Sequence, residues 1–294
     1  MTDFVIPLHR NNVLFRCTIE AIQMHYHPKM VHIITPSCEI EKLQSENWVS
    51  EFQNICFWDE ETFFLRSKYG LTRDAIEKWY GYRDSNSREF GWWFQQVIKL
   101  GALSCIPELS DPFMVWDSDL IPLEAWPIYP CCGSGDDQYR FALLQEKEKN
   151  EFNKREYAAS LFTLLGLVEI VPLEGGTFVP HHFVFHHCAV SGLIERIESR
   201  GVGGGCWIES VMKLSLEYYR FSEYKSMATF MSVFFPKLLC YHEFEHYGKR
   251  GLRIRDEKEA RDFVAGFDDL GYLGLMEYLK ESGLDISYLQ VEHL

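Results

Sequence analysis

The chain has 294 residues, 47% of them hydrophobic, which is enough for one large α/β domain with a sizeable core. Its formal net charge of −14 comes from 43 acidic and 29 basic residues, so it lacks the basic surface that binds nucleic-acid backbone. Nine scattered cysteines, with no CxxC pair and no zinc spacing, favour free thiols in a reducing compartment. The sequence shows neither a signal peptide nor an apolar stretch that could span a bilayer, so we expect a cytoplasmic protein.

Strand and helix signals alternate through the first 120 residues. Short apolar runs predict strands at 4–8, 31–34, 52–57 and 112–116. Helical spacing of apolar residues predicts helices at 12–25, 60–67, 72–80 and 88–100. This alternation predicts a mainly parallel sheet with helices on both faces, and such sheets bind ligands at the carboxyl ends of their strands. The candidate binding positions are therefore the strand ends at 7–11, 59–60 and 117–119.

The rest of the chain mixes the two kinds of signal. Strands are predicted at 139–144, 177–185 and 286–291. Helices are predicted at 154–165, 189–199, 207–214, 223–234, 257–267 and 272–282. We therefore expect a main domain over residues 1–220 and a mostly helical C-terminal extension over 221–294, packed together as one compact unit.

Two carboxylates, Asp117 and Asp119, lie between the apolar run that ends at Trp116 and a second apolar run at 120–123. A solvated turn does not normally lie between two such runs, and buried carboxylates need a counter-ion. Mn²⁺ or Mg²⁺ takes oxygen ligands, and as a Lewis acid it neutralises the charge on a departing nucleoside diphosphate. The pair therefore predicts a divalent-metal site for a sugar nucleotide, although an Asp-x-Asp sequence also arises by chance in turns.

Four sequence blocks carry a family resemblance. The segment Gly-Trp-Trp-Phe-Gln-Gln-Val-Ile-Lys-Leu at 91–100, followed by Met-Val-Trp-Asp-Ser-Asp at 114–119, resembles DxD-containing glycosyltransferase-like proteins of bacteria and large viruses. Residues 177–185 and 221–224 resemble two later blocks of the same group, so the resemblance extends over residues 3–225. It implies a GT-A fold, with a mainly parallel mixed sheet flanked by helices, and a nucleotide-sugar-binding catalytic domain over 1–220. It also implies a nucleoside diphosphate sugar donor and a divalent metal, but no particular sugar.

The implied fold places donor-binding residues at the strand ends. Arg10 would lie near the diphosphate and Asp59 near the base; alternatively, these positions belong to a strand-to-helix turn capped by Asn11 and to a helix start. Gln95 and Lys99 lie at i and i+4 on one helix face and would contact donor hydroxyls and phosphate, unless that face is only solvated. The predicted donor-binding residues are Pro7, Leu8, His9, Arg10, Asp59, Gln95, Lys99, Trp116, Asp117, Ser118 and His182.

A histidine from late in the domain often completes the metal site of GT-A enzymes. The candidates are His182, His242 and His246; we select His246 as the metal ligand beside Asp117 and Asp119. His181 and His182, if both lie on a strand, face opposite sides, so at most one of them points into the site.

The predicted catalytic residues are Glu223 and Asp119. An inverting transferase needs a carboxylate that deprotonates the acceptor hydroxyl, and Glu223 at a helix start fits this role. Alternatively, Glu223 holds the acceptor, or Ser222 and Glu223 are only the cap and first turn of the helix.

Together these features predict a metal-dependent glycosyltransferase. It would move a hexosyl or pentosyl group from a UDP- or GDP-sugar to a hydroxyl of a glycan or glycolipid acceptor, in the cytoplasm or peripherally at a membrane where glycans are assembled. A sugar nucleotidyltransferase is an alternative, but it would show a glycine-rich loop after the first strand, and residues 7–11 contain no glycine. A non-catalytic carbohydrate-binding protein is a second alternative, which explains the aromatic residues and leaves the Asp pair unexplained.

Overall fold

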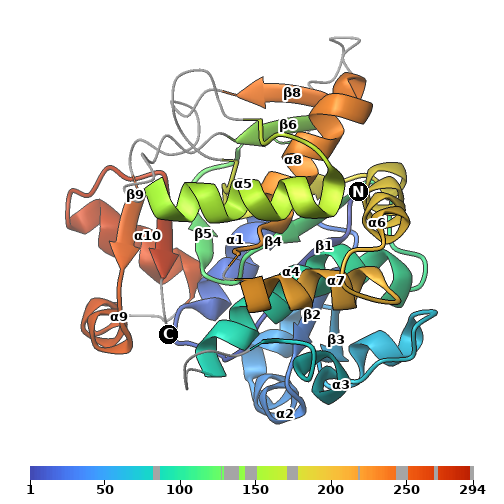
Figure 1. Ribbon diagram of the computed structural model, residues 1–294. Helices are drawn as coiled ribbons and strands as arrows, with labels where there is room; N and C mark the ends of the chain where they lie inside the picture. Colours follow the sequence, from blue (N-terminus) through green and yellow to red (C-terminus); the bar gives the residue numbers. More distant parts are fainter. Residues whose placement is uncertain are drawn as a thin grey trace.

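The computed structural model describes residues 1–81, 87–126, 128, 139–142, 151–170, 178–217, 219–242, 251–267 and 271–291. A five-stranded sheet lies at its centre, in the order β3-β2-β1-β4-β7 (Figure 1). Its strands are β1 (Phe4–Pro7), β2 (Val31–Thr35), β3 (Ile55–Asp59), β4 (Phe113–Trp116) and β7 (His182–Phe185). The first four run parallel, and β7 runs antiparallel to β4. The predicted mainly parallel α/β sheet is confirmed.

Helices cover both faces of this sheet. Those of the first half are α1 (Phe15–Tyr26), α2 (Ser37–Ser45), α3 (Arg73–Glu77) and α4 (Ser87–Cys105), with 3₁₀ helices η1 (Asn47–Glu51) and η2 (Phe63–Arg66). Those of the second half are α5 (Glu151–Leu165), α6 (His187–Arg200), α7 (Trp207–Lys213), α8 (Glu223–Phe234), α9 (Glu257–Val264) and α10 (Tyr272–Glu281), with η3 (Leu214–Glu217) and η4 (Pro236–Leu238).

Side chains of the central strands alternate between two core clusters. Val5, Val115 and Phe183 belong to a cluster that also takes residues of α4, α6, α7 and α8. Phe4 and Met114 belong to a second cluster, formed with α1. Because successive strand residues point to opposite faces, side chains pack against both faces of the sheet, and β1 and β4 appear in the sequence as unbroken apolar runs.

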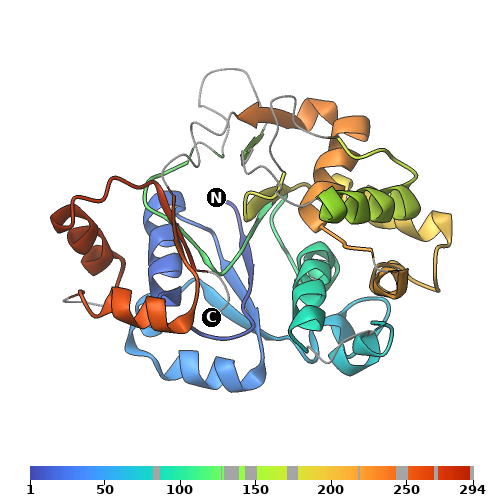
Figure 2. The same ribbon diagram turned by 60° about the vertical axis from the view of Figure 1, so that its left-hand side comes forward.

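Two smaller sheets involve the C-terminal part of the chain. β5 (Leu120–Pro122), β10 (Tyr288–Val291) and β9 (Gly251–Ile254) form one in that order, with β10 antiparallel to β5 and parallel to β9. β6 (Tyr139–Ala142) pairs with β8 (Leu239–His242). Figure 2 shows α9 and α10 (orange to red) on one side of the central sheet and α5 to α8 on the other. The predicted helices α8, α9 and α10 are present, but strand pairing crosses the predicted boundary at residue 220.

Some sequence-based boundaries are wrong. Of the strand expected at 177–185, residue 177 lies outside the described residues and the strand begins at His182, because His181 has a φ of 60°, which lies outside the extended region. The helix expected at 60–67 is the short 3₁₀ turn η2, and the strand expected at 52–57 lies at 55–59. None of the described helices combines the length and the apolar character needed to cross a membrane.

Candidate metal centre

The turn at residues 117–119 joins β4 to β5, at the carboxyl edge of the parallel strands. Its backbone is held by two segments that lie far away in the sequence. The Asp117 amide donates to the carbonyl of His181 (2.8 Å), which continues the antiparallel pairing of β4 with β7. The carbonyl of Asp119 accepts from the Val291 amide on β10 (2.8 Å). The two carboxylates are therefore fixed by the main chain as well as by their side-chain contacts.

Asp117, Asp119 and His181 form a compact ligand group. One ligand atom from each residue lies within 4.8 Å of the others. His181 Nδ1 is 3.0 Å from Asp117 Oδ2. Asp119 Oδ1 is buried and has no hydrogen-bond partner within the described part of the chain. Burying a carboxylate oxygen without a partner costs free energy unless a cation binds it, so these residues fit a divalent ion.

Lys99 of α4 lies directly against this group. Its side chain is 2% exposed, and its ammonium forms ion pairs with Asp117 and with Glu223 Oε1, the latter at 2.5 Å. The same ammonium lies 4.5 Å from the centroid of the Tyr224 ring. The predicted contact between Lys99 and a donor phosphate stays a prediction; the contacts described here are with carboxylates.

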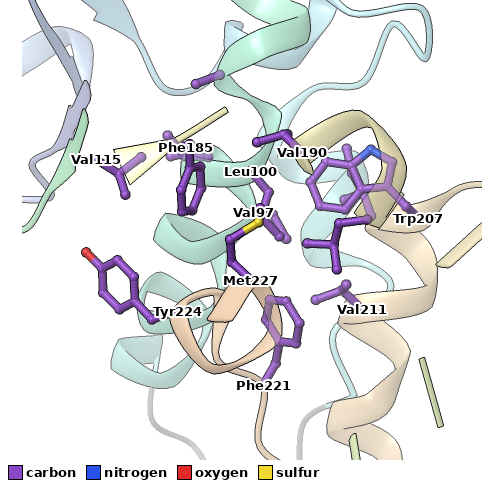
Figure 3. Close-up of a cluster of buried hydrophobic side chains, with 14 of the residues drawn as sticks. Val97, Leu100, Val115, Phe185, Val190, Trp207, Val211, Phe221, Tyr224 and Met227 are labelled. Carbon is purple, nitrogen blue, oxygen red and sulfur yellow. The ribbon is translucent and has the colours of Figure 1, made fainter. Parts of the chain in front are cut away.

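Tyr224 links the centre to the hydrophobic core. Its hydroxyl donates to Asp117 Oδ1 (2.7 Å), and its ring stacks on Phe183 with centroids 5.9 Å apart. Figure 3 shows the ring at the edge of the buried cluster, with the hydroxyl directed away from Phe221 and Met227. The apolar part of this side chain therefore packs in the core while its polar end orients a carboxylate.

Glu223 is placed by the start of α8. The side chain of Ser222 accepts a hydrogen bond from the amide of Lys225 (3.2 Å), which caps the helix. The Glu223 amide donates to Oε1 of Gln96 on α4 (3.2 Å). Sequence reasoning therefore placed Glu223 correctly in the first turn of a helix, and the packing of α8 on α4 brings its carboxylate to Lys99.

The pKa values of Asp117 and Asp119 are shifted in opposite directions. Burial favours a higher pKa for Asp117, but the Lys99 ammonium and the hydrogen bond with His181 outweigh it and hold that pKa well below its ordinary value. Burial raises the pKa of Asp119 to about 6, against the opposing charge of His181, and the Asp117 charge adds to the increase. Burial lowers the pKa of His181, but Asp117 and Asp119 reverse this and raise it overall. Of the two aspartates, Asp119 is therefore the one whose charge its neighbours compensate less.

The other predicted donor residues lie in two settings. His9 and Arg10 are exposed just beyond β1, whose last residue is Pro7, and Leu8 is buried. Although His9 is exposed overall, partial desolvation of its ring lowers its pKa, and the nearby positive charge of Arg73 lowers it further. Gln95 is half-buried on α4.

Asp59 caps the turn that follows β3. Its carboxylate accepts from the Glu61 amide (3.1 Å) and from Thr62 Oγ1 (3.2 Å), which matches the helix-start alternative. Ser118 contributes its carbonyl, which accepts from Thr18 Oγ1 on α1 (3.2 Å).

Trp116 and His182 are buried in the core. Their ring centroids lie 5.0 Å apart, and both rings pack against Trp126. Burial lowers the pKa of His182 to about 4, so the ring is neutral at physiological pH. His182 Nδ1 lies 2.8 Å from the carbonyl oxygen of Pro180. Roles of Trp116 and His182 in donor binding stay predictions.

Sequence reasoning missed His181 as the histidine beside the Asp pair. The expectation that His181 and His182 alternate on one strand was wrong, because His181 precedes β7 and has a left-handed backbone. The selected ligand His246 lies outside the described residues, and the side chain of His242 is not described. Pro180, directly before the pair, is the only local signal in the sequence that the strand is interrupted there.

Comparisons with known proteins give distant similarities. No protein-family model and no curated protein matches the chain. Mouse xyloside xylosyltransferase 1, in its apo form, is 10% identical with a TM-score of 0.48, over 98% of this chain and 97% of its own. The galactosyltransferase LgtC, solved with donor and acceptor sugar analogues, is 11% identical with a TM-score of 0.43, over 99% and 87%. The 4-diphosphocytidyl-2C-methyl-D-erythritol synthase of Anaerococcus prevotii DSM 20548 is 9% identical with a TM-score of 0.34, over 83% and 86%. These values are too low to assign a family or an activity.

Proposed function

We propose that this chain is a metal-dependent glycosyltransferase of the GT-A type, which transfers a sugar from a nucleoside diphosphate sugar to a hydroxyl of a glycan or glycolipid acceptor. The observation that carries the proposal is the unpaired, buried Oδ1 of Asp119 within a group of two carboxylates and one imidazole. This group lies at the carboxyl end of a parallel strand, where α/β sheets bind ligands.

Asp117, Asp119 and His181 would hold the ion. Carboxylates suit Mg²⁺ and Mn²⁺, whereas an imidazole suits transition metals, so this mixed set favours Mn²⁺. When bound, the ion neutralises the charge that develops on the leaving nucleoside diphosphate. The residues of the chain keep Asp117 ionised and oriented for this purpose: Lys99 and Tyr224 both contact its Oδ1.

Glu223 is proposed as a catalytic carboxylate, and its surroundings limit how it can act. Its side chain is 3% exposed, and its Oε1 bonds to Lys99. An acceptor hydroxyl would therefore have to reach its other oxygen. Without such contact, Glu223 acts on the centre only through Lys99 and Asp117. Arg10, exposed just beyond β1, is proposed as the cation that meets the diphosphate.

The proposal is tested by thermal unfolding with UDP-, GDP-, CMP- and dTDP-sugars, each with and without Mn²⁺. We expect one nucleotide to raise the unfolding temperature only when the metal is present, because the ion links the diphosphate to the carboxylates. Asp119→Asn should abolish this increase, whereas Asp262→Asn, an exposed substitution on α9, should keep it.

Three further outcomes separate the alternatives. Release of a nucleoside diphosphate from the stabilising donor, in the presence of an acceptor glycan, supports transfer. Release of pyrophosphate from a nucleoside triphosphate and a sugar 1-phosphate would instead identify a nucleotidyltransferase. Binding of free glycans without metal, and no response to any sugar nucleotide, would leave a carbohydrate-binding protein.

A further inference from the structure

The C-terminal strand β10 brings two successive residues to the candidate metal centre. The Val291 amide donates to the carbonyl of Asp119 (2.8 Å), and Nε2 of the Gln290 side chain lies 3.0 Å from Nε2 of His181. Gln290 is 2% exposed, so the packing around it, and not water, determines where its side-chain amide lies. Leu289 and Val291 pack in the cluster shared with α1 and α10, so strand alternation turns Gln290 to the opposite face.

Both ring nitrogens of His181 are engaged. Nδ1 lies 3.0 Å from Asp117 Oδ2, on the side of the two carboxylates, while Nε2 faces Gln290. An ion shared by Asp117 and Asp119 would therefore be met by Nδ1. An imidazole that binds a metal through one nitrogen carries its proton on the other, and that proton needs an acceptor. Rotation of the Gln290 carboxamide by 180° exchanges the positions of its NH₂ group and its oxygen. The oxygen then faces His181 Nε2 and can accept the hydrogen bond.

His181 also has an unusual backbone. Its φ of 60° is left-handed, which is uncommon for a residue with a side chain and persists only where the surroundings hold it. Its carbonyl is held by the Asp117 amide, and its ring is held between Asp117 and Gln290. This conformation is what turns the imidazole toward the carboxylates, out of the alternation of β7.

We infer that Gln290 is a positioning residue whose side-chain oxygen accepts a hydrogen bond from Nε2–H of His181 and so fixes Nδ1 as the nitrogen that binds the ion. The inference rests on the metal site of the proposed function, and it adds the C-terminal strand to that site. Partners of this kind behind a metal-bound histidine set the orientation and the basicity of the ring, and their loss weakens metal binding roughly 10- to 100-fold.

The test is Mn²⁺ affinity without any sugar nucleotide, measured from the signal of free Mn²⁺ in electron paramagnetic resonance. Gln290→Met keeps the length of the side chain and removes the acceptor, so affinity should fall roughly 10- to 100-fold. Gln290→Glu keeps an acceptor and should bind at least as tightly as the wild type. Gln23→Met is the matched control: it breaks the hydrogen bond of another glutamine, to Asn54 (2.8 Å), and should leave Mn²⁺ affinity unchanged.

Nitrogen-15 NMR of the histidine rings in Mg²⁺-loaded protein gives a second readout. Wild-type His181 should carry its proton on Nε2, and Gln290→Met should lose this preference. If Gln290→Met does not fold, Gln290→Asn, which withdraws the amide by one methylene, replaces it and should also bind Mn²⁺ more weakly.

Equal Mn²⁺ affinity in the wild type and in Gln290→Met, or an equal loss in Gln290→Glu, would overturn the role of Gln290 and leave the metal site standing. Failure of the wild type to bind Mn²⁺ at a site removed by Asp119→Asn would overturn both. Mn²⁺ binding that depends on Gln290, with no response to any sugar nucleotide, would support the role of Gln290 and contradict only the glycosyltransferase.

Discussion

Replacement of Lys99 by methionine tests how the buried charges hold the centre together. The substitution keeps the length of the side chain but removes the cation that Asp117 and Glu223 share. Glu223 is 3% exposed, so it would keep a buried charge with no cation beside it. Removing one partner of a buried ion pair typically costs about 3–5 kcal/mol, and we expect Lys99→Met to lower the free energy of unfolding by this amount at pH 7. Urea unfolding followed by circular dichroism measures it.

Two further variants test whether the loss of stability comes from the buried charge. Arg261→Met removes an ion pair with Glu257 of similar length, 2.6 Å, but both side chains are exposed (68% and 46%), so no resolvable loss is expected. Adding Glu223→Gln to Lys99→Met removes one of the stranded charges and should restore part of the stability. If Lys99→Met and Arg261→Met unfold at the same urea concentration, the buried charge at Lys99 does not stabilise the fold as expected.

Three further predictions concern single side chains. Without metal, Asp119→Asn should raise the free energy of unfolding by about 1–3 kcal/mol, because it removes a buried charge beside Asp117. The same substitution should abolish stabilisation by Mn²⁺. Urea unfolding with and without Mn²⁺ measures both effects. Tyr224→Phe keeps the ring in the core and removes the hydrogen bond to Asp117, so it should cost about 1.5–3 kcal/mol in urea; a loss below about 0.5 kcal/mol would contradict the bond. Burial raises the pKa of Glu60 from 4.5 to about 7, despite the nearby Arg73. The folded state therefore holds this proton more tightly than the unfolded state does. The free energy of unfolding should fall by up to roughly 3 kcal/mol as pH rises from 4.5 to 7. In Glu60→Gln the fall in the urea midpoint across that range should be smaller than in the wild type by the contribution of Glu60.

The central sheet could be predicted because its strands are buried on both faces. β1 and β4 are buried along their whole length and are unbroken apolar runs in the sequence, and β2 is a buried β-branched run interrupted by His32. The bounds of α8 agree with the prediction at both ends, since Ser222 caps its start and apolar residues follow at helical spacing. β9 was not predicted: its burial is only partial, and its pairing with β10 is a contact that local sequence does not encode.

The candidate site was predicted in part, for a similar reason. Asp117 and Asp119 could be found because buried apolar runs flank them in the sequence. Lys99 was identified on its helix, but its partner Glu223 is 124 residues away, and only the packing of α8 on α4 brings them together. His181 could not be found from strand alternation, because its contact with Asp117 depends on a single residue with a left-handed backbone.

The long separations within the candidate metal centre also decide when it can form. Asp119 is tied to Val291, and Asp117 to His181, so each contact closes a long loop whose entropy is lost before the contact is made. During synthesis the two aspartates leave the ribosome well before β10, and the nascent chain carries carboxylates with neither their histidine nor their anchoring strand. An ion bound here would therefore join a fold that has already formed, and tight Mn²⁺ binding would report that the segment around residue 290 has docked.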